Sequence, residues 1–140
     1  MSTGSARPSP APPVVAVGGI AVVDGALLMV RRATPPGVGR WTVPGGRVEP
    51  GESVTAAVER ELLEETALEV RCGPLVGWAE RRGDGHHFVI LDFAVTVTGS
   101  TAPTAGGDAA AVAWVPRAEV ATLDLVEGLE AFLLEHGVLV

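Results

Sequence analysis

Three glutamates in the middle of the chain, Glu61, Glu64 and Glu65, have the spacing of neighbouring side chains on one face of an α-helix. At about 100° per residue, the same face carries Val54 and Val58, so an apolar stripe continues into a stripe of carboxylates. Converging oxygen ligands of this kind select hard divalent cations rather than zinc. The spacing therefore predicts a Mg2+ site, with Mn2+ as the alternative metal.

A solvated acidic face is the ordinary explanation for a charge run. It fits this helix poorly, because the outward face already carries Glu59 and Arg60, whereas the inward glutamates have only Arg60 nearby in sequence as a counter-charge. Like charges held together in a partly dry site repel each other unless they are protonated or bound to cations. Mg2+ held by a few carboxylates leaves the rest of its shell to water and phosphate, so the chemistry indicated is phosphate handling.

The elements that must position these glutamates are strands on both sides of one central helix. Ser53 can cap a helix over Val54 to Thr66, and Asp24-Gly25 predicts a two-residue hairpin turn. A second hairpin is expected at Gly83-Asp84-Gly85, and an amphipathic helix over Leu125 to His136 closes the chain. The pattern predicts an α+β domain. Its strands are expected at Val14 to Val23, Ala26 to Val30, Trp41 to Val43, Leu68 to Arg71, Leu75 to Arg82, His86 to Thr98 and Val112 to Val115.

Length and composition limit the class of protein. The chain has 140 residues, of which 47% are hydrophobic, and this fits one folded domain. A formal net charge of -7 disfavours an electrostatic nucleic-acid binder, and no apolar run reaches the roughly 18 residues of a membrane span. Residues 1–13 are rich in Ser, Pro and Ala and lack an apolar core. We therefore expect a disordered tail over 1–13, a domain over 14–140 and a cytoplasmic location.

The residues around the central helix resemble the Nudix box of the Nudix hydrolase family. The pattern of that box is G-x5-E-x7-R-E-U-x-E-E-x-G-U, where U is a bulky aliphatic residue. The chain has Gly46, then Glu52 after five residues, then Arg60-Glu61-Leu62-Leu63-Glu64-Glu65-Thr66-Ala67-Leu68 after seven more. The one departure is Ala67, which replaces the second glycine. The preceding Trp41-Thr42-Val43-Pro44-Gly45-Gly46 is also typical of the family, and the flanking sequence is most similar to its small ADP-ribose pyrophosphatase branch.

The resemblance implies a Nudix-type α/β/α sandwich with a mixed β-sheet. It also implies hydrolysis of a nucleoside diphosphate linked to a moiety X, in which water attacks a phosphorus of the diphosphate bridge. Carried over to this sequence, Glu61, Glu64 and Glu65 are ligands of Mg2+, together with the backbone carbonyl of Gly45. Glu52 is expected to support the metal site or to bind through water.

By the same resemblance, Arg60 orients a glutamate through a charge-assisted hydrogen bond. Family members place the catalytic base variably, and we choose Glu61 as the base, with Glu64 as the second choice. Ala67 follows the helix C-terminus, where a residue in the left-handed conformation often lies, and alanine there costs about 1 kcal/mol. We expect a local adjustment at Ala67 rather than a loss of activity.

Five side chains outside the box are candidates for substrate binding. Asp108 lies in the loop before the Trp-x-Pro strand, where some relatives carry an acidic ligand or base, and a simple turn residue is the alternative. Arg31 and Arg32 follow the first hairpin, where they can meet phosphates or remain solvated. Trp41 can stack on a base or pack in the core. His87 can border the substrate pocket or be an ordinary strand residue.

Two further tryptophans, Trp78 and Trp114, are expected in the core, and Cys72 is expected to be an inert buried thiol. The first functional hypothesis is a pyrophosphohydrolase of an ADP-ribose-like substrate. The second is a house-cleaning hydrolase of oxidised or excess nucleoside triphosphates, and the third is a silent nucleotide sensor, which the intact glutamates disfavour. A homodimer is compatible with the apolar hairpin over Val14 to Val30 but is not indicated by it.

Overall fold

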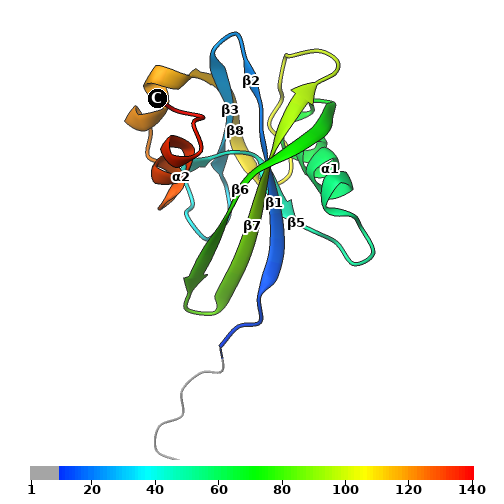
Figure 1. The fold of residues 1–140 in the computed structure, drawn as a ribbon, viewed down its shortest axis with the longest axis vertical. Coiled ribbons are helices and arrows are strands. Elements are labelled where there is room, and N and C mark those ends of the chain that lie inside the picture. Colours follow the sequence, from blue (N-terminus) through cyan, green and yellow to red (C-terminus); the bar gives the residue numbers. More distant parts are fainter. Residues whose placement is uncertain (1–9) are drawn as a thin grey trace, which may run out of the picture.

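The computed structural model describes residues 10–140, and Figure 1 shows how they are arranged. The first nine residues of the predicted tail lie outside the described residues, and residues 10–13 precede the first strand without forming a helix or a strand. The elements in chain order are β1 (Val14–Ile20), β2 (Val22–Val23), β3 (Ala26–Arg32), β4 (Trp41–Thr42), β5 (Gly45–Arg47), α1 (Val54–Thr66), β6 (Val70–Gly83), β7 (His86–Val97), β8 (Ala109–Pro116), the 3-10 helix η1 (Arg117–Thr122) and α2 (Leu129–Glu135).

The strands form two four-stranded sheets. One sheet has the order β5-β1-β7-β6, and in the other β3 pairs with β2, β4 and β8. Strands β1 and β7 run parallel, from Val14 opposite Phe88 to Ile20 opposite Ala94, whereas the other pairs are antiparallel. The predicted mixed sheet is therefore confirmed.

Two hydrophobic clusters place a helix on each side of these sheets (Figure 1). Side chains alternate along β3, so Leu28 packs in the cluster that contains α1, whereas Leu27 and Met29 pack in the cluster that contains η1 and α2. All three side chains are completely buried. The predicted α/β/α sandwich is confirmed, and β3 lies at its centre because both of its faces are apolar.

Helix α1 has the bounds that the sequence predicts. The Ser53 hydroxyl accepts a hydrogen bond from the Ala56 N–H at 3.1 Å, which satisfies one of the free donors at the helix start. Ala67 ends the helix in the left-handed conformation, with φ 61°. Val58 and Leu62 are completely buried, so the apolar stripe anchors the helix against the sheets.

Several strands and the closing helix differ from the prediction. β6 is one strand rather than two, because register shifts between Cys72 and Gly77 let the chain pass Gly73-Pro74 while still pairing with β7. The closing helix begins only at Leu129, since Gly128 adopts φ 82°, and the sequence did not predict η1. The apolar run at the N-terminus is interrupted between β1 and β2.

The expectation that both remaining tryptophans are core residues is correct for Trp114 and wrong for Trp78. Trp114 packs partly buried against the cluster that contains α1, and its indole N–H donates to the Thr101 carbonyl at 2.8 Å. Trp78 is 61% exposed. Its neighbour Ala79 faces the α2 cluster, so strand alternation places Trp78 on the opposite face of the sheet. Neither hydrophobic cluster includes Trp78.

Candidate active site

Helix α1 carries the three predicted metal ligands at different depths. Glu65 lies on the inner face and is 8% exposed. The Glu61 side chain, one turn earlier, is 14% exposed, whereas the Glu64 side chain is 53% exposed. The structure therefore places Glu61 and Glu65 in a partly dry site and Glu64 at its rim.

The Arg60 guanidinium connects most of the acidic residues of the site. Its Nε and Nη2 donate to the two carboxylate oxygens of Glu52 at 2.7 and 2.9 Å. Its Nη1 donates to Glu61 at 2.9 Å and to Glu64 at 3.2 Å, and Nη2 also reaches the Arg47 carbonyl at 3.0 Å. A planar guanidinium suits this forked arrangement. The contact predicted between Arg60 and a glutamate is present, and Glu52 is held by the same group.

Glu52 remains ionised across the ordinary pH range. The pKa of Glu52 is lowered to about 2, chiefly by the hydrogen bonds from Arg60 and also by the Glu49 N–H, which donates to it at 3.1 Å. The pKa of Arg60 is raised in turn, chiefly by its bond to Glu52. Glu52 and Arg60 thus form a permanently charged brace beside α1.

Glu65 has the opposite electrostatic situation. The pKa of Glu65 is raised to about 7, chiefly by burial and also by the nearby charges of Glu61 and Asp108. The Gly45 N–H, which donates to Glu65 Oε1 at 2.9 Å, and the charge of Arg32 act in the other direction. The pKa of Glu61 is also raised by burial, although Arg60 opposes the rise. The carboxyl groups of Glu61 and Glu65 therefore share a site with too little positive charge to stabilise both of them in the ionised form.

The two glycines of β5, Gly45 and Gly46, allow this strand to approach the glutamates closely. A Cβ at Gly46 would lie 2.5 Å from Glu61 Oε2, and a Cβ at Gly45 would overlap the Val17 carbonyl oxygen. Neither glycine has a positive φ, so they are required for space rather than for an unusual backbone conformation. The sequence placed the carbonyl of Gly45 at the metal, whereas the contact seen is the one that its N–H makes with Glu65.

Two of the candidate substrate residues lie near the carboxylates. The loop that ends in Asp108 lies against the C-terminal end of α1, where the Gly106 N–H donates to the Glu65 carbonyl at 3.1 Å. Asp108 is exposed, and its charge acts on Glu61 and Glu65. Arg32 acts electrostatically on Glu65, while its Nε donates to the Pro36 carbonyl at 2.5 Å.

The other three candidates make contacts elsewhere. Arg31 is exposed near the end of β3. Trp41 packs partly buried against the α2 cluster, and its backbone bonds to Asp124 and Val126. The His87 ring lies 2.9 Å from a Glu80 oxygen on the neighbouring strand. Substrate roles for these three residues stay predictions, and the contacts shown are those of ordinary packing and pairing.

The donor set fits a hard divalent cation. Its side-chain donors are carboxylate oxygens, which is the ligand chemistry of Mg2+ and Mn2+. The raised pKa values of Glu61 and Glu65 show that a further positive charge at this place would be stabilising. Among residues 10–140, no three His, Cys, Asp or Glu side chains are already arranged around one point. Arg60 holds the oxygens of Glu61 and Glu64 instead, so metal binding requires these bonds to rearrange.

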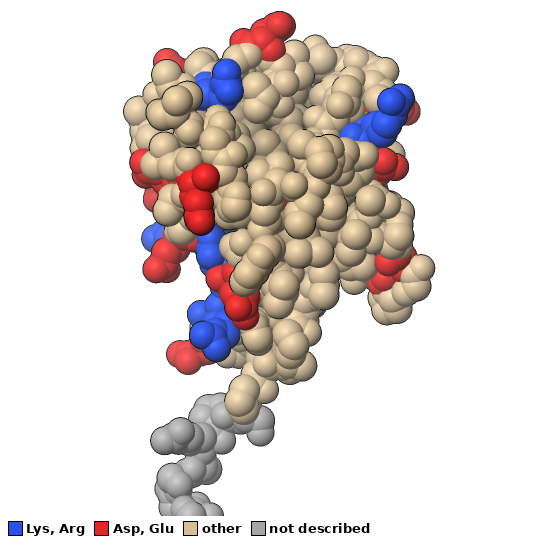
Figure 2. All heavy atoms as spheres, viewed as in Figure 1, with Lys and Arg blue, Asp and Glu red and all other residues tan. Residues whose placement is uncertain are grey.

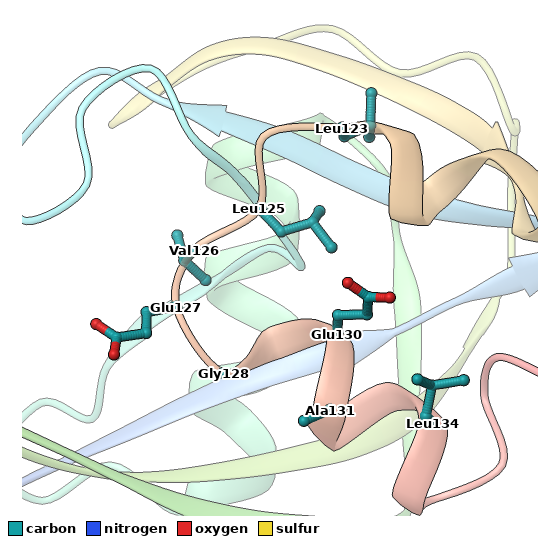
Figure 3. Close-up of a pocket in the computed structure, with 8 residues that line it drawn as sticks. All are labelled: Leu123, Leu125, Val126, Glu127, Gly128, Glu130, Ala131 and Leu134. Carbon is teal, nitrogen blue, oxygen red and sulfur yellow. The ribbon is translucent and has the colours of Figure 1, made fainter.

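A separate groove of about 460 Å3 lies between α2 and the segment before it (Figure 3). None of the predicted site residues lines it. Its wall is mostly apolar, with two glutamates. The lining residues are Leu123, Leu125, Val126, Glu127, Gly128, Glu130, Ala131 and Leu134.

The molecular surface gives no sign of a basic binding face in the view of Figure 2, where acidic and basic side chains are scattered around a largely uncharged area. The described residues contain no helix that is long and apolar enough to cross a membrane.

The sandwich and its carboxylate-bearing helix define the class of fold that the box predicts. The chain belongs to the NUDIX family, because the model of the NUDIX domain matches residues 12–135. Members of this family are hydrolases that act on phosphoric anhydride bonds. The family expectation from the sequence is therefore confirmed.

Individual relatives point to more than one substrate. The chain is 38% identical over 99 residues to a protein of Methanocaldococcus jannaschii named ADP-ribose pyrophosphatase, covering 69% of this chain and 58% of that protein. It is 36% identical over 118 residues to a putative 8-oxo-dGTP diphosphatase of Mycobacterium tuberculosis, covering 80% and 79%. The MutT protein of Methanosarcina mazei has the same fold, with a TM-score of 0.82 at 21% identity over 91% of this chain and 94% of that one.

Proposed function

We propose that this chain is a Mg2+-dependent Nudix pyrophosphohydrolase that cleaves the diphosphate bridge of a nucleoside diphosphate linked to X, with an ADP-ribose-like substrate favoured. The observation that carries the proposal is the pair of largely buried carboxyl groups of Glu61 and Glu65. Arg60 donates a hydrogen bond to Glu61, and the Gly45 N–H donates one to Glu65. This arrangement has an excess of negative charge that a divalent cation can balance, and a cation bound there can also bind the negatively charged phosphate of the substrate.

In the proposed reaction, each residue of the chain has a distinct part. Glu65, Glu61 and Glu64, with the Gly45 carbonyl, are the expected metal ligands, and Glu52 braces the site through Arg60. The bound metal would neutralise charge on the diphosphate. Glu61 is the expected base, which accepts a proton from the attacking water. The water oxygen bonds to phosphorus, and the bridging oxygen leaves with the other phosphate.

The second candidate substrate is an oxidised nucleoside triphosphate, and the Mycobacterium tuberculosis relative favours it. That relative aligns over more of this chain than the Methanocaldococcus jannaschii protein does. The two reactions break the same type of bond, and the carboxylate site serves either. The choice between them belongs to residues that contact the nucleoside, for which Arg31, Arg32, Trp41, His87 and Asp108 remain the candidates.

A substrate panel tests the proposal directly. Purified protein with Mg2+ is expected to release AMP and ribose 5-phosphate from ADP-ribose, while 8-oxo-dGTP would give the monophosphate and pyrophosphate if the second candidate is correct. Substitution of Glu61→Gln or Glu65→Gln is expected to lower kcat/KM by at least about 100-fold. Glu130→Gln, at an exposed position on α2, is the matched control and should leave the rate unchanged. No turnover of any nucleotide would favour the sensor, and wild-type rates in both site variants would refute the metal site.

We also propose the metal preference, the location, the partners and the oligomeric state that the sequence suggests. Mn2+ is expected to replace Mg2+ in the assay, and the protein is expected to act in the cytoplasm on small nucleotides without nucleic acid or membrane partners. A homodimer remains compatible with the apolar hairpin over Val14 to Val30. Sedimentation of the purified protein measures the oligomeric state.

A further inference from the structure

One carboxyl group is buried in the middle of the β5-β1-β7-β6 sheet without a hydrogen-bond partner. Asp92 on β7 is 5% exposed, and among residues 10–140 its Oδ1 is the single buried side-chain oxygen or nitrogen that forms no hydrogen bond. Leaving a buried acceptor unpaired is destabilising, because it loses its hydrogen bonds to water and gains none in the protein. A buried polar group that is left unpaired in this way needs an explanation.

The residues opposite Asp92 on the two neighbouring strands are glycines, which leave space beside them. Asp92 lies opposite Gly18 on β1 and opposite Gly77 on β6. A Cβ at Gly18 would overlap Asp92 Oδ1 and would lie 3.4 Å from the Pro44 carbonyl oxygen. A Cβ at Gly77 would lie 2.5 Å from the His136 ring. Neither glycine has a positive φ, so each is required for the space beside it.

A continuous line of close contacts runs from Asp92 to the active site. Gly18 pairs with Gly45 of β5, and a Cβ at Gly45 would lie 2.8 Å from Gly18 Cα. The preceding residue, Pro44, accepts the Gly19 N–H at 2.9 Å. The Gly45 N–H donates to Glu65 Oε1 at 2.9 Å. Tightly packed interiors transmit displacements, so this line of contacts can carry a shift at Asp92 to Glu65.

We propose that Asp92 is a positioning residue. Its carboxyl group fills the space left by Gly18, fixes the Pro44-Gly45 segment, and through the Gly45 N–H fixes the orientation of Glu65 for the metal. This inference rests on the metal site of the proposed function.

Charges on the other side of Asp92 offset part of the cost of burying a carboxyl group here. Burial raises the pKa of Asp92 to about 6, and the charges of Arg81 on β6 and His136 after α2 oppose the rise. Arg81 lies close to Gly128 at the start of α2. Asp92 therefore lies between the C-terminal helix and the segment that holds Glu65.

The test uses variants in which a side chain at position 18 clashes with Asp92, and a double variant in which removal of the Asp92 side chain relieves that clash. Mn2+ affinity of the metal-free full chain is measured by titration calorimetry, with thermal unfolding to monitor folding. Gly18→Ala drives a methyl group into the Asp92 carboxyl group, and Asp92→Ala leaves a hole, so each is expected to weaken Mn2+ binding by about tenfold or more. The double variant Gly18→Ala/Asp92→Ala puts the methyl group into the hole and should restore the affinity to within about threefold of wild type.

Two further variants separate positioning from general loosening. Asp92→Asn keeps the size and shape of the side chain and should retain Mn2+ affinity within about threefold. Gly77→Ala makes a comparable clash on the other side of Asp92, against His136, and should lower the unfolding temperature without changing Mn2+ affinity.

Each outcome is decisive. Wild-type Mn2+ affinity in Gly18→Ala and Asp92→Ala would overturn the positioning role while leaving the proposed function intact. An equal loss in Gly77→Ala, or no recovery in the double variant, would also overturn it. A wild-type protein that binds no Mn2+ would overturn the proposed function, and this inference with it.

Discussion

At the scale of single residues, the site is organised by one cation, Arg60, and one buried acid, Glu65. Arg60 contributes three donor nitrogens to Glu52, Glu61 and Glu64, so its side chain determines where these carboxylates point. Glu65 is outside this network and depends on the Gly45 N–H instead. The site therefore has one rigid, charged half and one half whose charge depends on pH or on a bound cation.

Arg60→Lys is expected to lower kcat/KM by about 10- to 100-fold, because a single ammonium group cannot bond both oxygens of Glu52 and reach Glu61 as well. Steady-state kinetics with Mg2+ measures the loss. Arg40→Lys is the matched control, since Arg40 makes only an exposed 3.8 Å contact with Asp124 and should behave as wild type. Equal rates in both variants would show that the forked bonding of Arg60 is not needed.

At the scale of elements, α1 is both the carrier of the site and part of the core. Its cap at Ser53 and its buried Val58 and Leu62 hold the helix so that Glu61 and Glu65 face the β5 segment. The loop before β8 adds to this by bonding to the last turn of the helix, through Gly106 and Thr104. The weak point of the element is its end, where Ala67 adopts φ 61°.

Ala67→Gly is expected to stabilise the protein by about 1 kcal/mol, because glycine adopts a positive φ without the steric cost that alanine carries. Chemical denaturation measures the free energy of unfolding. Ala56→Gly, at an exposed position inside the same helix, is expected to destabilise by about the same amount. The activity of Ala67→Gly should equal that of the wild type. A loss of stability in this variant would show that the left-handed end of α1 carries no strain.

At the scale of the whole molecule, buried carboxyl groups determine how stability depends on pH. Glu65 and Asp92 have pKa values raised to about 7 and about 6, so the folded state holds their protons more tightly than the unfolded state does. Their contribution is fully present below about pH 4 and is lost as the pH rises to about 7. Glu52, with a pKa lowered to about 2, contributes above about pH 4.5 and loses its contribution as the pH falls toward 2.

The metal-free protein is therefore expected to unfold at a higher temperature at pH 5 than at pH 7.5, with Glu65 responsible for about 3 kcal/mol at most. Thermal unfolding in the presence of a chelator measures the difference. Glu65→Gln should reduce it, and adding Mg2+ to the wild-type protein at pH 7.5 should raise the unfolding temperature. A wild-type protein that is more stable at pH 7.5 than at pH 5 without metal would contradict the assignment.

The sequence by itself determined the parts of this protein that depend on local spacing. The bounds of α1, its Ser53 cap, the left-handed end at Ala67 and the hairpin turns all follow from neighbouring residues. The family and the candidate ligands follow from the same 23-residue stretch, since a helix brings residues three and four apart together whatever lies around it.

The tertiary structure alone decided what depends on strand register and on burial. Pairing of β1 with both β5 and β7 brings Gly45, Gly18 and Asp92 into one line, although they are far apart in the chain. The register of β6 against β7 in the same sheet determines that Trp78 is exposed, which its apolar ring does not predict. Register fixes which residues become neighbours across strands, and burial then fixes their charge states, so neither could be deduced from local sequence.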